Sequence, residues 1–150
     1  MTLDHGTELS PGEADALLGR RETGVLSLAR DGEPYSIPIS YGYDADERRF
    51  YLRLVSAPTS GKRRFLASEP HARLVVYEEA DPVYRSAVAA GRLEEVPRDR
   101  LTVEDVEGYG DAKRPLFEIW EESRADLVTR LYRFDPETLS GHRVEIDRSD

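Results

Sequence analysis

Short β-type segments separated by turn residues run through most of this sequence, and they constrain the fold more than any other feature. Residues 23–29 (TGVLSLA) and 35–43 (YSIPISYGY) are rich in residues that favour strands, and Asp31-Gly32 between them is a strong hairpin signal. Hairpin spacing of this kind predicts an antiparallel barrel rather than a parallel α/β sheet. Further strands are expected at residues 49–55, 72–77, 83–96, 127–134 and 142–146.

Helical signals lie between these strands. Residues 10–13 (SPGE) combine an N-cap serine, a first-turn proline and a capping-box glutamate, so a helix is predicted to begin here and to end at Gly19. A short helix is expected over residues 60–68, ended by the Glu-Pro pair that follows it. A helical pattern returns between residues 97 and 123. Residues 1–9 are interpreted as a flexible N-terminal tail.

Pro38 interrupts the alternating strand of residues 35–43. Its nitrogen carries no proton to donate to a neighbouring strand, so a proline inside a strand indicates an edge position or a β-bulge.

The charge balance excludes two classes of partner. The chain has 21 Lys and Arg against 30 Asp and Glu, a formal net charge of −9. This argues against nucleic-acid binding through bulk electrostatics and against docking on anionic membranes. Its 150 residues fit one domain, residues 1–150. No run of about 20 apolar residues occurs and the start resembles no secretion signal, so a cytoplasmic location is the simplest expectation.

The basic residues are almost all arginine. Only Lys62 and Lys113 are lysines, and the other 19 are arginines. An acidic chain with scarce lysine is expected from a salt-adapted organism, where carboxylates hold water and hydrated cations. A GC-rich genome produces the same bias toward arginine, and the sequence leaves both explanations open.

Several catalytic motifs are absent. Without cysteine, the chain has no disulfide, no thiolate nucleophile, no iron–sulfur cluster and no cysteine-type zinc site. Its three histidines lack metal-site spacing, and there is neither a nucleophile elbow, a Walker A loop nor a GxGxxG dinucleotide motif. Acidic groups such as Glu78-Glu79 are interpreted as solvated surface. We therefore expect no metal site and no protein nucleophile.

Residues 59–66 (TSGKRRFL) conflict with ordinary helix electrostatics. Three consecutive cations stand in the first turn of the predicted helix, where the macrodipole already supplies positive charge, at a cost of about 0.3–1 kcal/mol each. A bound anion would resolve the conflict, because backbone N–H groups, the Ser60 hydroxyl, Lys62 and Arg63 would converge on it. Phosphate is the obvious candidate. The alternative is that these cations pair with nearby carboxylates.

An ordered series of segments spans about residues 11–141, and none of them is specific alone. In order and spacing they resemble the pyridoxamine 5′-phosphate oxidase-like, FMN-binding split-barrel superfamily, in the branch related to nitroimidazole-resistance reductases. The segments are TGVL at 23–26, DGEPY at 31–35, IPISY at 37–41, FYLR at 50–53, SGKR at 60–63, YRSAV at 84–88, GR at 91–92, LYRFDPE at 131–137 and LSG at 139–141.

The resemblance implies a mainly β (α+β) fold, a six-stranded antiparallel split β-barrel with short flanking helices. It also implies a homodimer with two FMN sites at the subunit interface. Matched by position, Ser60, Lys62 and Arg63 bind the FMN phosphate, and Ser86 reaches the flavin from the second subunit. The backbone of Pro38, Ile39, Ser40 and Tyr41 lies along the isoalloxazine ring, and Leu52 and Arg53 line the neighbouring strand.

Two departures from the family pattern narrow the implied chemistry. Arg53 stands where the nearest branch often carries histidine, which disfavours a heme-linked role and would stabilise anionic reduced FMN. Ile37 replaces the basic residue of the vitamin-B6 oxidases, so pyridoxamine phosphate oxidation is disfavoured. The resulting expectation is an FMN-dependent oxidoreductase acting with a small-molecule electron donor and acceptor. The alternatives are a non-catalytic flavin carrier or sensor, and the same fold holding a deazaflavin or heme.

Overall fold

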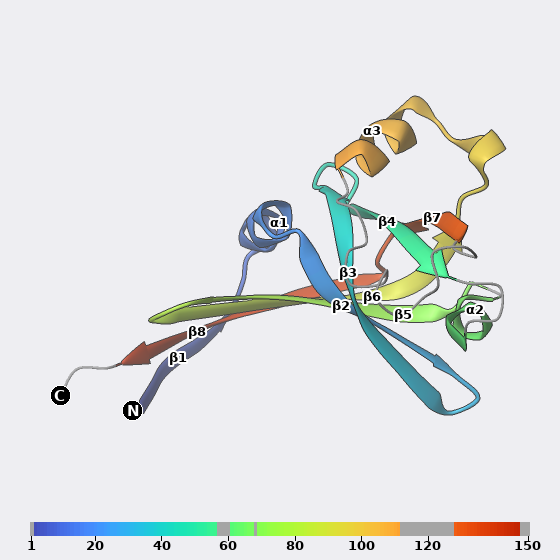
Figure 1. Ribbon diagram of the computed structural model, residues 1–150. Coiled ribbons are helices and arrows are strands. Elements are labelled where there is room, and N and C mark those ends of the chain that lie inside the picture. Colours follow the sequence, from blue (N-terminus) through green and yellow to red (C-terminus); the bar gives the residue numbers. More distant parts are fainter. Residues whose placement is uncertain (1, 57–60, 68, 112–127, 148–150) are drawn as a thin grey trace.

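The computed structural model describes residues 2–56, 61–67, 69–111 and 128–147, and antiparallel strands dominate it (Figure 1). In chain order the elements are β1 (Thr2–Glu8), α1 (Pro11–Arg20), β2 (Thr23–Arg30), β3 (Glu33–Asp44), β4 (Arg49–Ser56), α2 (Gly61–Leu66), β5 (His71–Ala80), β6 (Val83–Glu95), the 3-10 turn η1 (Arg98–Arg100), α3 (Val103–Asp111), β7 (Val128–Phe134) and β8 (Thr138–Asp147). The helical pattern expected between residues 97 and 123 lies in part, over residues 112–123, outside the described residues.

Six strands close into a barrel. The sheet order is β1-β8-β6-β5-β2-β3-β4-β7. A further pairing between β6 and β7 closes the part of the sheet that runs from β6 through β5, β2, β3 and β4 to β7 into a barrel. All of these pairings are antiparallel. The expected six-stranded antiparallel split barrel is therefore confirmed, with β8 and β1 added outside it along β6.

The N-terminal residues are not the flexible tail that we expected. They form β1, which pairs with β8 from Thr2 opposite Asp147 to Glu8 opposite His142. The N–H of Leu9 then donates to the carbonyl of Gly141 at 2.9 Å. A Cβ on Gly141 would lie 2.8 Å from Leu9 Cδ1, so only glycine lets this leucine pack so closely. The segment is ordered by backbone pairing with a distant strand, which local sequence patterns do not reveal.

The hairpin between β2 and β3 forms where its turn residues predict it. Asp31 and Gly32 have φ angles of 51° and 78°, both in the left-handed region that a two-residue hairpin turn requires. The register pairs Arg30 with Glu33 and continues to Thr23 opposite Ser40.

Helix α1 is built by the predicted capping box. The Ser10 N–H donates to the Glu13 carboxylate at 3.0 Å, and the Glu13 N–H donates to the Ser10 hydroxyl at 3.2 Å. Ala14, Leu17 and Leu18 form the buried face, as their spacing indicates. The helix ends at Arg20, one residue beyond the expected Gly19.

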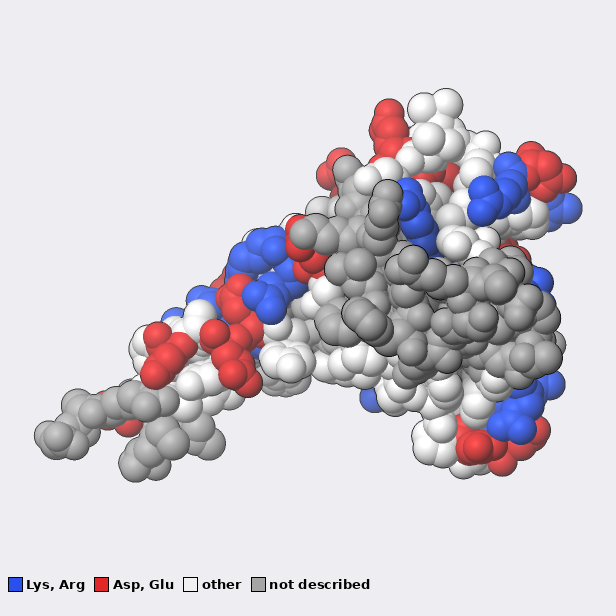
Figure 2. Space-filling view, viewed as in Figure 1, with Lys and Arg blue, Asp and Glu red and all other residues white. Residues whose placement is uncertain are grey.

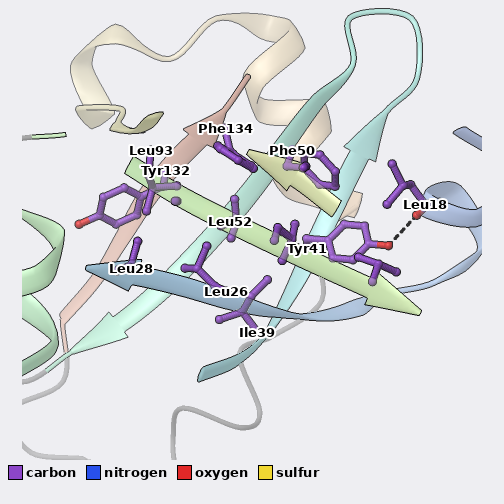
Figure 3. Close-up of a cluster of buried hydrophobic side chains, with 14 of the residues drawn as sticks. Leu18, Leu26, Leu28, Ile39, Tyr41, Phe50, Leu52, Leu93, Tyr132 and Phe134 are labelled. Atoms are coloured by element: carbon purple, nitrogen blue, oxygen red, sulfur yellow. Dashed lines mark hydrogen bonds between the residues drawn. The ribbon is translucent and has the colours of Figure 1, made fainter. Parts of the chain in front are cut away.

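The barrel interior is filled by side chains from every second residue of its strands (Figure 3). Phe50 and Phe134 are fully buried, with ring centroids 5.7 Å apart. Burying each such side chain stabilises the fold by about 1.5–3 kcal/mol. The interior is therefore a packed core, and a ligand must bind at its ends or outside its wall.

One side of the molecule extends beyond the barrel. The ends of β5, β6, β8 and β1 project together as an arm that ends near both termini (Figure 1). Basic and acidic side chains intermingle on its visible surface (Figure 2). Arg20 at the end of α1 donates to Glu78 of β5 at 2.8 Å, and Arg85 of β6 lies 3.4 Å from the same carboxylate. No helix among the described residues is both long and apolar enough to cross a membrane.

Candidate functional site

Strand β3 has an open edge over its first part. It pairs with β2 from Glu33 to Ser40, but its register with β4 begins only at Tyr41 opposite Leu52. The N–H of Tyr41 donates to the Glu22 carbonyl at 3.0 Å, so the backbone groups of Tyr41 face β2. In antiparallel pairing, successive residues direct their backbone groups to opposite sides of the strand, so those of Pro38, three residues earlier, face away from β2. The missing N–H of Pro38 therefore faces the open edge, which confirms the edge position predicted from the sequence.

The candidate residues of β3 divide between the two faces of the strand. Pro38 is exposed, whereas Ile39 and Tyr41 point into the barrel and are at most 2% exposed. The Tyr41 hydroxyl donates to the Leu18 carbonyl of α1 at 2.8 Å (Figure 3), and burial raises the pKa of this phenol. Ser40 is also buried. The side chains of Ile39 and Tyr41 therefore face the core, and the same alternation directs their backbone groups to β2. The backbone groups of Pro38 and Ser40 are the ones that face the open edge.

The neighbouring strand β4 also turns its two candidate residues to opposite sides. Leu52 is completely buried in the barrel. Arg53 is half-buried and donates from Nη2 to the Tyr109 carbonyl of α3. The Tyr109 hydroxyl in turn donates to the Tyr132 carbonyl at 2.7 Å, and burial raises its pKa.

Sequence reasoning did not find this attachment of α3 to the barrel. A Cβ on Gly108 would overlap the Tyr51 ring, so glycine is required where α3 meets β4. The only local signal was the capping pair of α3, in which the Asp105 N–H donates to the Thr102 hydroxyl at 3.1 Å. Arg53 therefore has a structural partner on α3.

The three consecutive cations of α2 have different surroundings. Ser60 and the Lys62 side chain lie outside the described part of the structure. Arg64 is exposed, forms an ion pair with Glu33 at 2.5 Å and lies 4.9 Å above the Phe65 ring. The alternative of pairing with a nearby carboxylate thus holds for Arg64. Arg63, in contrast, is half-buried and turns toward a hollow at the end of the barrel.

This hollow has a volume of about 340 Å³ and lies between α2 and the adjoining ends of β6 and β7. Two arginines, Arg63 and Arg130, line it together with Glu69 and Glu95. Arg130 lies 3.5 Å from Glu95, and both side chains are more than a third exposed, so this ion pair is weak. The remaining lining residues are Leu66, Ala67, Leu93 and Tyr132. We call this space the α2 hollow.

Ser86 is separate from the other candidates. It is half-buried on β6, between Tyr77 of β5 and His142 of β8. It lines neither the α2 hollow nor the open edge of β3. The β3 and β4 candidates lie on neighbouring strands, Arg63 lines the α2 hollow, and Ser86 belongs to neither group.

The outer face of the sheet beside Ser86 is poor in charge. Register places Pro38, Val25, Val75, Val88 and Ser140 in one row across β3, β2, β5, β6 and β8. The alternating burial of these strands puts the row on the side away from the core. Tyr77, next to this row, is 56% exposed. In a chain with 34% charged residues, this surface is unusual. We call it the outer sheet face.

A second hollow, of about 400 Å³, lies between α3 and the turn that joins β3 to β4. Its lining includes Asp44, Asp46, Glu47, Glu104 and Glu107. No three acidic or histidine side chains within the described ranges are placed to share a metal ion. We assign no metal site to this hollow.

Two features of the described residues could bind a ligand. The open backbone edge of β3 offers hydrogen-bonding groups to a flat heterocycle, and Arg63 offers a cation to an attached phosphate.

Most of the chain matches the model of one known family. The family model described as pyridoxamine 5′-phosphate oxidase matches residues 10–143. No curated protein is significantly similar to the chain in sequence.

Three solved structures share the architecture. An FAD-binding protein from Mesorhizobium loti is 22% identical with a TM-score of 0.72, over 95% of this chain and 98% of that one. The FAD-binding protein from Mycobacterium smegmatis is 18% identical with a TM-score of 0.69, over 94% and 100%. A protein from Bacteroides thetaiotaomicron named for 5-nitroimidazole antibiotic resistance is 13% identical with a TM-score of 0.63, over 95% and 91%. At these identities the likeness establishes the fold alone.

Proposed function

The chain belongs to the pyridoxamine 5′-phosphate oxidase family, and on this premise we propose that it binds a flavin. FMN is the proposed form, because it carries both the ring and the phosphate for which residues are assigned below. We further propose that it acts as an oxidoreductase on a small-molecule donor and acceptor. The family match over residues 10–143 carries the proposal. Two structurally similar proteins are described as FAD-binding, which supports the cofactor class.

The proposed roles of the residues follow from their places in the fold. A bound flavin supplies the electron or hydride transfer itself, so no protein nucleophile is required. The open edge of β3 receives the polar edge of the ring, where the backbone groups of Pro38 and Ser40 face away from β2. Ser60, Lys62 and Arg63 hold the phosphate. Arg53 is tied to α3 and orients its strand beside the ring.

A homodimer is part of the proposal. The outer sheet face is poor in charge and offers the apolar centre that a stable interface needs. Ser86 borders this face and, in a dimer formed through it, would reach the flavin of the other subunit. Sedimentation of the purified protein should give twice the chain mass. The substitution Val75→Asp should return it to a monomer, because two unpaired carboxylates would be buried at such an interface.

The first experiment is the visible absorption spectrum of the purified protein, with mass identification of any released chromophore. About one flavin per chain supports the proposal. A colourless protein that also fails to bind added FMN contradicts it. A heme or deazaflavin spectrum would keep the fold and replace the cofactor.

The second experiment separates the three cations of α2. Replacing Lys62 and Arg63 together with alanine should weaken FMN binding by about 3 kcal/mol or more, since charge-assisted hydrogen bonds to phosphate are lost. Arg64→Ala is the matched control, because Arg64 already pairs with Glu33. Titration with FMN, followed by flavin fluorescence, measures both variants. Wild-type affinity in the double variant, or an equal loss in the control, would remove the phosphate assignment.

A further inference from the structure

Another hollow indents the outer sheet face on its β3 side. It has a volume of about 280 Å³ and is formed by the end of α1 together with β2, β3 and β5. Its lining residues are Arg21, Thr23, Gly24, Val25, Pro38 and Tyr77. We call this space the Arg21 hollow.

Pro38 joins the Arg21 hollow to the proposed flavin site. Its backbone faces the open edge of β3, where the polar edge of the ring is proposed to bind. Its neighbours Ile37 and Ile39 point into the barrel, so the side chain of Pro38 points the other way, to the outer sheet face. A molecule in the hollow therefore contacts the same residue as the ring. A group that exchanges hydride with a flavin must lie about 3–3.5 Å from it, so this is a suitable place for a substrate.

Two consecutive arginines at the end of α1 have different surroundings. Arg20 donates two hydrogen bonds to the Glu78 carboxylate, at 2.8 and 2.9 Å. Arg21 is exposed and lines the hollow, and its guanidinium has no hydrogen bond or ion pair within the described residues. The six lining residues, all of them described, include no carboxylate, although the chain has 30 acidic residues. The charge of Arg21 is thus available to an anionic ligand.

The rest of the lining suits a flat molecule. Tyr77 is 56% exposed, so its ring offers a surface on which an aromatic ligand can stack. Val25 and Pro38 supply apolar contacts, and Thr23 supplies one hydroxyl group. A guanidinium holds a carboxylate through two parallel hydrogen bonds. The volume lies just below the usual range of small-molecule sites, which favours a ligand smaller than the flavin itself.

We propose that the Arg21 hollow binds the small-molecule substrate of the flavin, and that this substrate is a flat anion. Its carboxylate pairs with Arg21 and its ring stacks on Tyr77. The inference rests on the proposed function and names the class of molecule that binds beside the ring. In the proposed dimer, a second copy of the chain would border the hollow. Neither Arg21 nor Tyr77 was a candidate from the sequence.

The test compares benzoate, a flat anion, with benzamide, a neutral molecule of nearly the same shape. Calorimetric titration of the flavin-loaded protein should show at least fivefold tighter binding of benzoate. Arg21→Gln should weaken benzoate binding about 5- to 20-fold and leave benzamide binding unchanged, because charge-assisted hydrogen bonds at an exposed site are lost. Arg21→Lys keeps the charge without the bidentate geometry, so its loss should be smaller. FMN affinity should not change in either variant.

Two further variants separate the ring contact from the charge. Tyr77→Ala should weaken binding of both probes equally, about two- to tenfold, because stacking does not depend on the carboxylate. Arg20→Gln is the matched control, since it removes the same charge one residue away and Glu78 keeps Arg85 at 3.4 Å. It should change neither affinity.

The visible absorption of the bound flavin reports whether the hollow adjoins the ring. Benzoate should shift this spectrum in the wild type, and at the same concentration the shift should be much smaller in Arg21→Gln. Equal affinity for the two probes, an equal loss in Arg20→Gln, or benzoate binding without a spectral shift overturns the substrate assignment while flavin binding stands. A loss of FMN affinity in Arg21→Gln as large as the loss for benzoate would assign Arg21 to the flavin and also overturns it. Failure of the wild type to bind any flavin overturns the proposed function itself.

Discussion

Helices α1 and α2 lie on opposite sides of the barrel (Figure 1). They differ in how well their sequences match the requirements of a stable helix. In α1 every local signal agrees, with a capping box, a first-turn proline, a glutamate near its N-terminus and one buried apolar face. In α2 the first turn has no acidic residue and carries consecutive cations. Both helices contribute to the same core, α1 through Leu17 and Leu18 and α2 through Phe65 and Leu66.

This difference indicates that the local sequence of α1 serves the stability of the fold, whereas the cations of α2 serve ligand binding. Agreement among local signals is what a stable element needs, and disagreement tends to occur where a ligand completes the site. In α2 one cation, Arg64, is neutralised by Glu33, whereas Arg63 borders a hollow. We therefore expect substitutions on the buried face of α1 to change the free energy of unfolding, and substitutions of Lys62 and Arg63 in α2 to change flavin affinity.

The largest effect that would test this division is in α1. Leu17 has no exposed surface, so Leu17→Ala removes buried methyl groups and leaves a cavity. The free energy of unfolding should fall by about 2–5 kcal/mol, measured by chemical denaturation. The flavin dissociation constant of the folded variant should stay unchanged. A loss of flavin affinity as large as that of the Lys62/Arg63 variant would abolish the distinction between the helices.

A smaller effect is expected where α1 meets the proposed flavin strand. Tyr41→Phe removes the hydrogen bond from the buried hydroxyl to the Leu18 carbonyl. The unfolding free energy should fall by about 1 kcal/mol. Flavin affinity should not change, since the Tyr41 hydroxyl is directed to α1 and not to the open edge of β3. If flavin affinity falls while stability does not, the side chain itself takes part in binding.

The smallest effect is a pH dependence of α1. Hydrogen bonds from the Ser10 backbone N–H and side chain lower the pKa of Glu13 below its ordinary value of 4.5. A carboxyl group whose pKa is lowered in the folded state stabilises that state above its ordinary pKa, and the contribution is lost as pH falls through the folded-state value. Glu13→Gln should remove this part of the acid sensitivity. NMR titration of Glu13 checks the shift directly, and an unshifted pKa would contradict it.

Local features of the fold could be predicted because their causes lie within a few residues. The capping box of α1 and the Asp31-Gly32 turn formed where the sequence indicated, since each depends on neighbours in the chain. Pro38 marked the strand edge for the same reason, because a missing N–H is a property of one residue. Strand β1 was missed because its partner β8 lies more than 130 residues away along the chain, from Leu3 to Ile146.

Apart from β1, the sequence by itself thus determined the types of the main elements, the antiparallel barrel and the family, since alternation, turn residues and segment order are encoded locally or in series. Only the tertiary structure decided that Arg64 pairs with Glu33 and that Arg63 borders a hollow. It also brought Arg63, Glu95 and Arg130 from three elements to one space. The physical reason is that the pairing of β6 with β7 closes the barrel and so sets how far the residues of β6, β7 and α2 lie from one another. Closure depends on contacts between residues far apart in the chain.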